Sequence, residues 1–209
     1  MKARLLITSL YLLLVMALPS AGQSYVGGAG MVNAGYMYTP GFSSSLSTNF
    51  DNSIRFQNGY SVVGMEINYR NARSVIVAAG YMGAQEAQWV NDKFIEPIVL
   101  KAHGGYGWIV SHNRSFALYP VLGVGAIQSS LTYHYQSDYE TKSVHTSPLI
   151  DITAHFDYLF RNGTDDEAFD AVIMSIRAGY SYGLANSGLR GWMFTISFGG
   201  VAFMKEKHY

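Results

Sequence analysis

The segment from Ile150 to Phe160 alternates between two kinds of side chain. Its even positions are apolar or aromatic, and four of its five odd positions are polar or charged, in the order Ile-Asp-Ile-Thr-Ala-His-Phe-Asp-Tyr-Leu-Phe. Because successive side chains of a β-strand point to opposite faces, this segment predicts a strand that separates an apolar from an ionic environment. The same pattern recurs along most of the chain and predicts an all-β fold.

The first residues have the organisation of an export signal. Lys2 and Arg4 precede an apolar run over residues 5–18, and Pro19 and small residues follow it. The run is shorter than the roughly 20 residues that a membrane-spanning helix needs, so a cleaved signal peptide is favoured over a retained anchor helix. We expect residues 1–22 to be the signal peptide and residues 23–209 to form a single barrel domain.

Composition excludes several classes of site and partner. The 14 basic and 14 acidic residues balance, so nothing favours binding to nucleic acid. Cysteine is absent, which excludes disulfides, thiolate metal sites and a lipidated cysteine after the signal. The chain is rich in glycine (22) and tyrosine (16), whereas charged residues make up only 13%. Such a composition suits a closed sheet better than a bundle of helices.

Eight segments fit strands, and most are long enough for the roughly 9–11 residues with which a tilted strand crosses a bilayer. The predicted strands are 25–38, 59–69, 74–84, 95–110, 115–135, 148–160, 171–183 and 191–204. Their connections alternate in length: 39–58, 85–94, 136–147 and 184–190 are the long series, and 70–73 and 111–114 are tight, although 161–170 is longer than this scheme expects. The pattern predicts an eight-stranded antiparallel up-and-down transmembrane barrel with both termini on one side.

The alternation also assigns the two faces of the wall. The residues predicted to face lipid are Ile150, Ile152, Phe156, Ile176, Phe194, Ile196 and Phe198. The residues predicted to form an interior polar network, centred on Arg177 with Asp157 nearby, are Glu66, Lys101, His103, Asp151, His155, Asp157 and Arg177. Since side chains fill an eight-stranded barrel, we expect a packed polar interior without an open channel.

Aromatic residues gather near the predicted strand ends, as they do in the interfacial girdles of membrane proteins. The set predicted for the outer rim is Tyr36, Tyr38, Tyr60, Tyr81, Tyr133, Tyr180, Tyr182 and Trp192, and the set for the inner rim is Tyr69, Trp108, Phe116, Tyr158 and Phe160.

With its long alternating strands, aromatic rims and export signal, the chain resembles the small eight-stranded outer-membrane barrels of the OmpA and OmpX type, and more loosely the short outer-membrane barrel proteins of Bacteroidetes. The resemblance is architectural and covers residues 23–209. It implies a location in the outer membrane of a Gram-negative bacterium, in contact with outer-membrane lipid. The expected function is structural or adhesive. Loops 39–58, with Phe42, Phe50 and Phe56, and 136–147, with Tyr139, would contact surfaces or partner proteins.

Two other functions stay open at this point. His145 and Ser147 form a His-x-Ser pair that could act in a lipid-modifying hydrolase with Glu140 or Asp151, although chance explains two such residues in a polar loop better. A soluble periplasmic carrier barrel would instead turn its apolar face inward around a ligand. His103 and His155 lie near carboxylates, yet no spacing matches a metal site, and we expect no cofactor and no enzymatic activity.

Overall fold

The computed structural model describes residues 25–42, 56–71, 73–90, 93–112, 115–135, 138–161 and 168–205. The predicted signal peptide therefore lies outside the described residues. The elements are β1 (Tyr25–Tyr38), β2 (Gly59–Asn71), β3 (Ser74–Ala84), β4 (Gln88–Val90), β5 (Lys93–Trp108), β6 (Ser111–His112), β7 (Phe116–Tyr135), β8 (Asp138–Arg161), β9 (Ala168–Gly183), the 3₁₀ helix η1 (Ser187–Leu189) and β10 (Gly191–Lys205).

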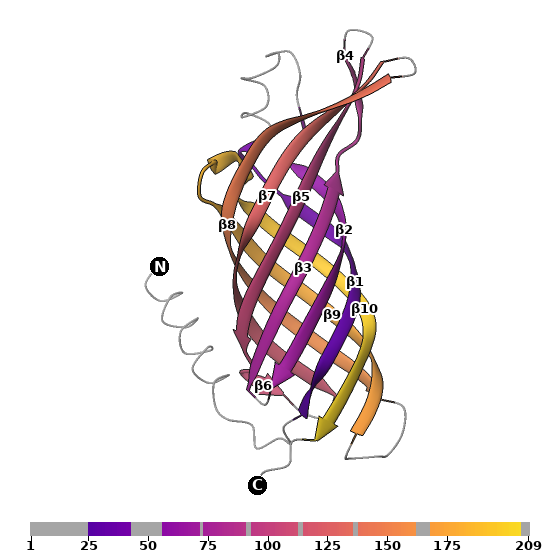
Figure 1. The fold of residues 1–209 in the computed structure, drawn as a ribbon, viewed down its shortest axis with the longest axis vertical. Helices are drawn as coiled ribbons and strands as arrows, with labels where there is room; N and C mark the ends of the chain where they lie inside the picture. Colours follow the sequence, from indigo (N-terminus) through magenta and orange to yellow (C-terminus); the bar gives the residue numbers. More distant parts are fainter. Residues whose placement is uncertain are drawn as a thin grey trace, which may run out of the picture.

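The eight long strands form a closed barrel. Each pairs antiparallel with its neighbours in the order β5-β3-β2-β1-β10-β9-β8-β7, and pairing of β7 with β5 closes the circle. Figure 1 shows the strands tilted around a long central axis. The predicted eight-stranded antiparallel up-and-down barrel is confirmed. No helix among the described segments has the length and apolar character needed to cross a bilayer.

The barrel has two unlike ends. Tyr25 at the start of β1 pairs with Lys205 at the end of β10, so the chain enters and leaves the barrel at the same end, which we call the terminal end. The connections between β1 and β2, β3 and β5, β7 and β8, and β9 and β10 lie at the other end, which we call the loop end. At the terminal end β2 runs to Asn71 and pairs with Ser74, so the turn there is tighter than predicted.

Two of the predicted loops at the loop end contain strands. In the segment 85–94, β4 folds back and pairs with the start of β5. The segment 136–147 is wrong as a loop, because β8 begins at Asp138 and pairs with β7 up to Tyr135, with a register shift between Ser129 and Ser130. The segment resembles a loop in the sequence because it lacks apolar alternation. Its Tyr, Thr and Val residues are nevertheless strand formers.

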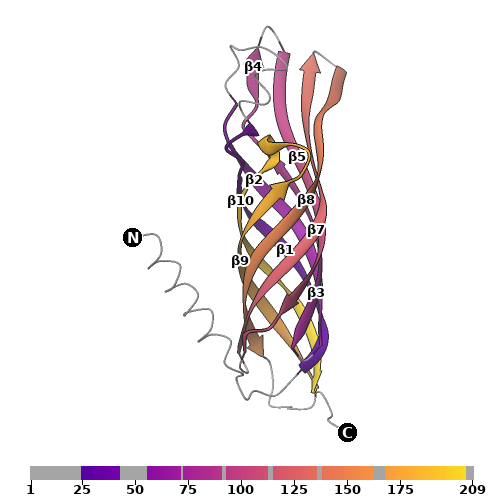
Figure 2. The same ribbon diagram turned by 90° about the vertical axis from the view of Figure 1, so that its left-hand side faces the viewer.

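These extended strands rise beyond the rest of the barrel. The pairing of β8 with β9 stops at Leu149 and Gly183, whereas β5, β7 and β8 remain paired well past that level. Figures 1 and 2 show them above the loop end, with β4 beside β5. We call β4, the start of β5, the end of β7 and the start of β8 the protruding sheet.

Apolar clusters fill both ends of the interior. The loop-end cluster comprises Met37, Phe42, Phe56, Tyr60, Val62, Ala79, Tyr81, Ile95, Val99, Ile127, Leu131, Leu149, Leu189 and Met193. Two smaller groups form the terminal-end clusters, one around Leu159, Ile173 and Phe203 and the other around Val75, Val77 and Val121. Apolar side chains therefore gather toward both ends of the interior.

Candidate functional site

The outer wall of the barrel is apolar. Of the seven residues predicted to face lipid, six are exposed on this wall: Ile152, Phe156, Ile176, Phe194, Ile196 and Phe198. Ile150 lies on the same face but is only partly exposed. Large apolar residues on the other strands, such as Val32, Met65 and Leu122, are also more than half exposed. An apolar surface of this extent exceeds what a monomeric protein normally presents to water.

The interior holds the ionic side chains. All seven residues of the predicted polar network are buried inside the barrel: Glu66, Lys101, His103, Asp151, His155, Asp157 and Arg177. They occupy successive inward positions, so that Asp151, His155 and Asp157 descend along β8 from the loop end toward the terminal end. The contacts divide them into three groups at different heights.

The group nearest the loop end is built around Lys101. Its Nζ donates to Asp151 Oδ1 and to Ser181 Oγ, both at 2.8 Å. The Ser181 hydroxyl in turn donates to the same Asp151 oxygen at 2.7 Å. His103 Nε2 lies 3.4 Å from the other Asp151 oxygen. Lys101 and Asp151 thus form a buried ion pair in direct contact.

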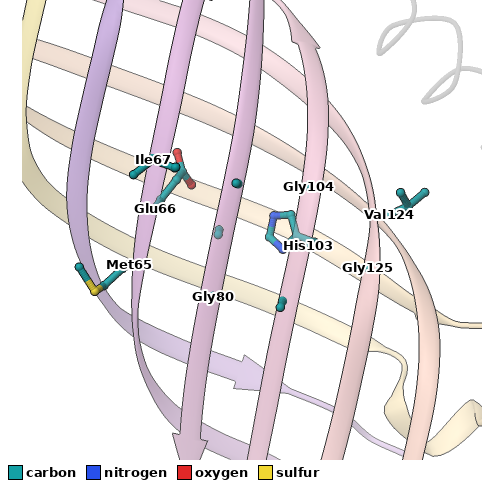
Figure 3. A pocket seen from close by; sticks show the side chains of 11 residues that line it. Met65, Glu66, Ile67, Gly80, His103, Gly104, Val124 and Gly125 are labelled. Atoms are coloured by element: carbon teal, nitrogen blue, oxygen red, sulfur yellow. The ribbon is translucent and has the colours of Figure 1, made fainter.

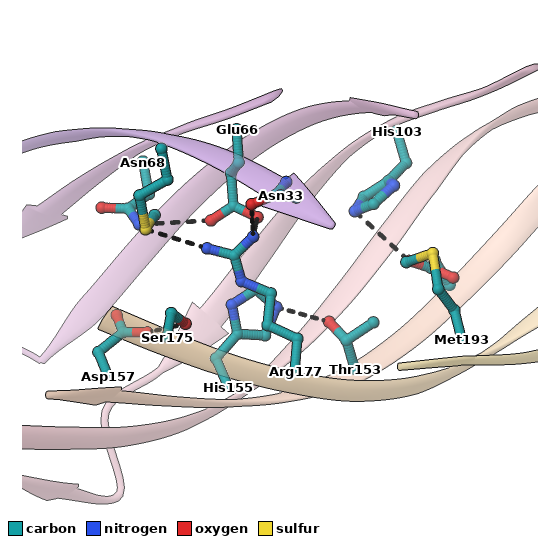
Figure 4. Close-up of polar contacts among 12 residues, drawn as sticks. Asn33, Glu66, Asn68, His103, Thr153, His155, Asp157, Ser175, Arg177 and Met193 are labelled. Atoms are coloured by element: carbon teal, nitrogen blue, oxygen red, sulfur yellow. Dashed lines mark hydrogen bonds and ion pairs between the residues drawn. The ribbon is translucent and has the colours of Figure 1, made fainter. Parts of the chain in front are cut away.

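The central group is built around Arg177. Its Nη1 lies 2.7 Å from Glu66 Oε2 and donates to Asn33 Oδ1 at 3.0 Å. Asn68 Nδ2 lies 3.4 Å from the other Glu66 oxygen. Figure 4 shows the guanidinium reaching across the lumen toward Glu66 and Asn33. Arg177 is thus the centre of this group, and its ion-pair partner is Glu66 and not Asp157.

The group nearest the terminal end is built around Asp157, which pairs with Arg70. The Tyr119 hydroxyl donates to this carboxylate at 2.7 Å, and the Ser175 hydroxyl donates to its other oxygen. The Arg70 guanidinium also lies over the rings of Tyr119 and Phe203, at 5.4 and 5.3 Å from their centroids. The sequence interpretation missed Arg70, because it placed that residue in a turn.

Like Glu66 and Asn68, Arg70 occupies an even-numbered, inward-facing position of β2. The alternation of side chains along this strand could therefore have identified Arg70 as an interior residue. With Arg70 included, three cations face three carboxylates: Lys101 with Asp151, Arg177 with Glu66, and Arg70 with Asp157. The pairing is complete among these six groups. Isolated buried charges would each cost several kcal/mol, so their mutual neutralisation is what makes this interior tenable.

The predicted aromatic rims are partly wrong. Tyr60 and Tyr81, assigned to the outer rim, are buried inside the loop-end cluster. Both residues occupy inward-facing positions of their strands, and this determines their burial although they lie near a strand end. Tyr133 lies in β7, but its side chain is outside the described part. The remaining members with large exposure do stand on the outer wall: Tyr36, Tyr38, Tyr182 and Trp192 toward the loop end, and Tyr69, Trp108, Tyr158 and Phe160 toward the terminal end.

The aromatics expected to act from the first loop also point elsewhere. Phe42 and Phe56 are buried in the loop-end cluster, and the Phe42 ring packs edge-on against Tyr60 at 5.1 Å between centroids. Gln85 Nε2 holds the same segment by donating to the carbonyl of Gln57 at 2.6 Å. These two phenylalanines close the mouth of the barrel and are not presented to a partner. Phe50 lies outside the described residues.

The His-x-Ser pair lies in strand β8 and not in a loop. Ser147 is fully buried; its hydroxyl donates to the carbonyl of Pro148 at 2.8 Å and accepts from the amide of Ala185 at 2.9 Å. It thereby ties the β9–β10 connection to β8. Asp151, one of the two possible third members, is engaged by Lys101 and Ser181, and the side chain of Glu140, the other, lies outside the described part. The geometry gives Ser147 a structural role.

Replacing Ser147 with Ala is therefore expected to leave lipid A unaltered. Mass spectrometry of lipid A from cells that express the wild type or Ser147→Ala should give the same acylation pattern, with no deacylated species in either. A deacylated form that disappears with the substitution would restore the hydrolase hypothesis.

Among the described residues, no group of three or more His, Asp or Glu side chains is arranged to hold a metal ion. His155 shares a hydrogen bond of 2.8 Å with Thr153 Oγ1, and its ring packs against Tyr119 at 4.9 Å. The two interior histidines thus belong to the polar packing.

No family model and no curated protein matches the chain. Solved structures with a similar fold include Ail of Yersinia pestis (8% identity, TM-score 0.46, covering 88% of this chain and 99% of Ail). They also include the N-terminal β-barrel domain of OprF from Pseudomonas aeruginosa (16%, 0.36, 87% and 98%) and neisserial surface protein A (9%, 0.38, 87% and 97%). At these values the likeness says nothing of partners or activity, and the fold assignment stands on the strand pairing itself.

Proposed function

We propose that the protein is an outer-membrane barrel with a sealed interior that works through its protruding sheet, in a structural or adhesive role. The observation that carries this proposal is the inside-out arrangement of the wall. Three ion pairs lie inside the lumen, whereas the outer wall exposes large apolar side chains between two sets of aromatic residues. That arrangement suits lipid outside the barrel, and a carrier of apolar ligands would need the reverse.

The location has a direct test. Cells that express the full chain should yield the protein in the outer-membrane fraction, and its gel mobility should differ between boiled and unboiled samples. Recovery in the soluble fraction would reject the membrane barrel and make the exposed apolar wall an interface of another kind.

The sealed interior argues against a pore. Three ion pairs lie at successive heights of the lumen, and apolar clusters that include Phe42 and Phe56 lie toward one end and Phe203 toward the other. We expect the purified protein in a planar bilayer to show no stable single-channel conductance. Reproducible channels of one unit conductance would contradict the sealed lumen.

The protruding sheet offers the surface for contact. Among the described residues, no strand pairs with residues 138–144 of β8 on the side away from β7. At about 3.4 Å per residue, this edge is roughly 24 Å long. An edge of regularly spaced amide and carbonyl groups can accept an extended segment of another protein as an added strand.

Shortening the β7–β8 hairpin tests this role. Replacing residues 133–140 with Asn-Gly, a dipeptide that closes two-residue hairpins, removes the tip of the hairpin, including residues 138–140 of the edge, above the paired Thr132 and Thr141. Vesicles that carry the wild type should attach to immobilised extracellular-matrix proteins, and vesicles with the shortened variant should lose at least ten-fold in attachment. The control Tyr139→Val with Thr141→Val keeps strand propensity and should attach like the wild type. Equal attachment of the shortened variant, with its heat-dependent mobility intact, would reject the proposal.

A further inference from the structure

A hollow of about 540 Å³ lies in the outer wall over strands β2, β3, β5 and β7. Its outward-facing floor consists of Ala78 and Gly80 on β3 and Ala102 and Gly104 on β5. Met65 and Ile67 on β2 form one flank and Val124 on β7 forms the other, each of them at least 66% exposed. Figure 3 shows these flanking side chains on either side of the glycines.

The hollow exists because the floor residues lack side chains. A Cβ atom added at Gly80 would meet nothing within 4 Å, and one at Gly104 would only touch the carbonyl of Val77 at 3.7 Å. Glycine is therefore not needed there for packing inside the protein. Large exposed residues continue the wall beyond the floor along both strands: Ile76, Met82, Leu100 and Tyr106. The hollow is bounded on every side by protruding side chains.

Its chemistry admits only an apolar occupant. Every outward side chain that lines it is apolar or absent, since Glu66 and His103, which also line it, turn their ionisable groups into the lumen. Its two flanks lie three strand spacings apart, about 14 Å. It lies close to the aromatic residues Tyr106 and Trp108, which mark the terminal-end rim of the wall. An occupant that reaches the hollow from that rim enters beside rings that favour the headgroup level.

A lipid chain fits this space better than a second barrel does. Two barrels in one membrane would meet with convex walls, which touch along a narrow line and leave a hollow largely unfilled. A flexible hydrocarbon chain can follow the floor and pack against both flanks at once. Its contacts with Met65, Ile67 and Val124 would add dispersion energy that a smooth wall lacks.

We propose that this hollow holds an acyl chain of a glycerophospholipid as a resident lipid. The inference rests on the proposed membrane orientation, and it goes beyond that orientation by assigning one lipid site to one part of the wall. The neighbouring wall over β8, β9 and β10 carries large exposed side chains, among them Phe156, Phe194 and Phe198.

Native mass spectrometry tests the site. The full mature chain would be reconstituted with dipalmitoyl phosphatidylethanolamine, released from detergent, and scored for retained lipid. The wild type should keep one lipid per barrel. Gly80→Leu and, separately, Ala102→Leu fill the hollow and should lower the lipid-bound fraction at least five-fold. The matched controls Ala154→Leu and Ala178→Leu, on the outward face of β8 and β9, should bind lipid like the wild type.

Three outcomes would overturn the site: no retained lipid on the wild type, equal retention in all variants, or a dimer that disappears with Gly80→Leu. The last would assign the hollow to a second copy. Heat-dependent mobility of each variant shows whether it has folded, and the two independent filling variants guard against failure of one. A barrel that is found in the membrane but fails this test loses only the lipid site, whereas a barrel absent from the membrane loses the proposed function as well.

Discussion

Asp157→Ala is expected to lower the free energy of unfolding by about 3–5 kcal/mol, the usual cost of leaving a buried charge without its partner. The substitution strands the Arg70 guanidinium in the lumen and removes the acceptor of the Tyr119 and Ser175 hydroxyls. Urea unfolding of the barrel in lipid vesicles, followed by tryptophan fluorescence, measures the effect.

Two further variants show whether the loss of stability comes from the unpaired Arg70 charge or from the substitution of a residue as such. Replacing the whole pair with apolar residues, as Arg70→Met with Asp157→Leu, should recover most of the lost stability because no charge is then left alone. Asp170→Ala removes an exposed carboxylate near the terminal end and should stay within about 0.5 kcal/mol of the wild type. A cost below 1 kcal/mol for Asp157→Ala would mean that water reaches Arg70 freely, which contradicts the sealed lumen.

Ile196→Arg is expected to destabilise the barrel by about 2–4 kcal/mol when the protein is in a bilayer, as arginine does on the lipid face near the membrane midplane. Ile196 is exposed on the outer wall at mid-height of β10, opposite Ala34 and Ile176 on the flanking strands. The same urea titration in vesicles gives the value.

The matched control is Met204→Arg, on the same face of the same strand but at the terminal end. There the cost should fall to about 0–1 kcal/mol, because arginine near the interface reaches water. If water surrounded the wall, both substitutions would cost little and the difference between them would vanish. The difference in destabilisation between the two positions therefore shows whether lipid or water surrounds the wall.

The alternation of side chains made most of the fold predictable. Period-two patterns located the eight long strands, and the inward parity of β8 and β9 placed Asp151, Asp157 and Arg177 in the lumen. What alternation cannot give is which inward charges meet, because partners across a lumen depend on strand tilt and register. Arg177 therefore pairs with Glu66 on β2, and Arg70 was overlooked although it has the same parity.

Two other features depended on context that the sequence pattern lacks. The first residues of β8, 138–144, show no apolar period and therefore resemble a loop in the sequence. Tyr60, Tyr81, Phe42 and Phe56 fill the mouth of the lumen, where aromatic volume is needed to close the space above the ion pairs. The position of Tyr60 and Tyr81 near a strand end suggests an outer rim. Only their place among the inward-facing positions of their strands indicates that they are buried.

Each of the three ion pairs joins strands that are not neighbours in the sheet. Lys101 and Asp151 join β5 to β8, Arg177 and Glu66 join β9 to β2, and Arg70 and Asp157 join β2 to β8. A partly assembled sheet in the bilayer would therefore carry unpartnered charges on one face, next to hydrocarbon. For the two pairs that join β2 to β8 and to β9, only completion of the circle brings the partners together and removes that penalty. The lumen thus acts as a checkpoint on assembly: insertion and closure should occur as one concerted step, and a chain that stops short of the final β1–β10 seam should be rejected by the membrane.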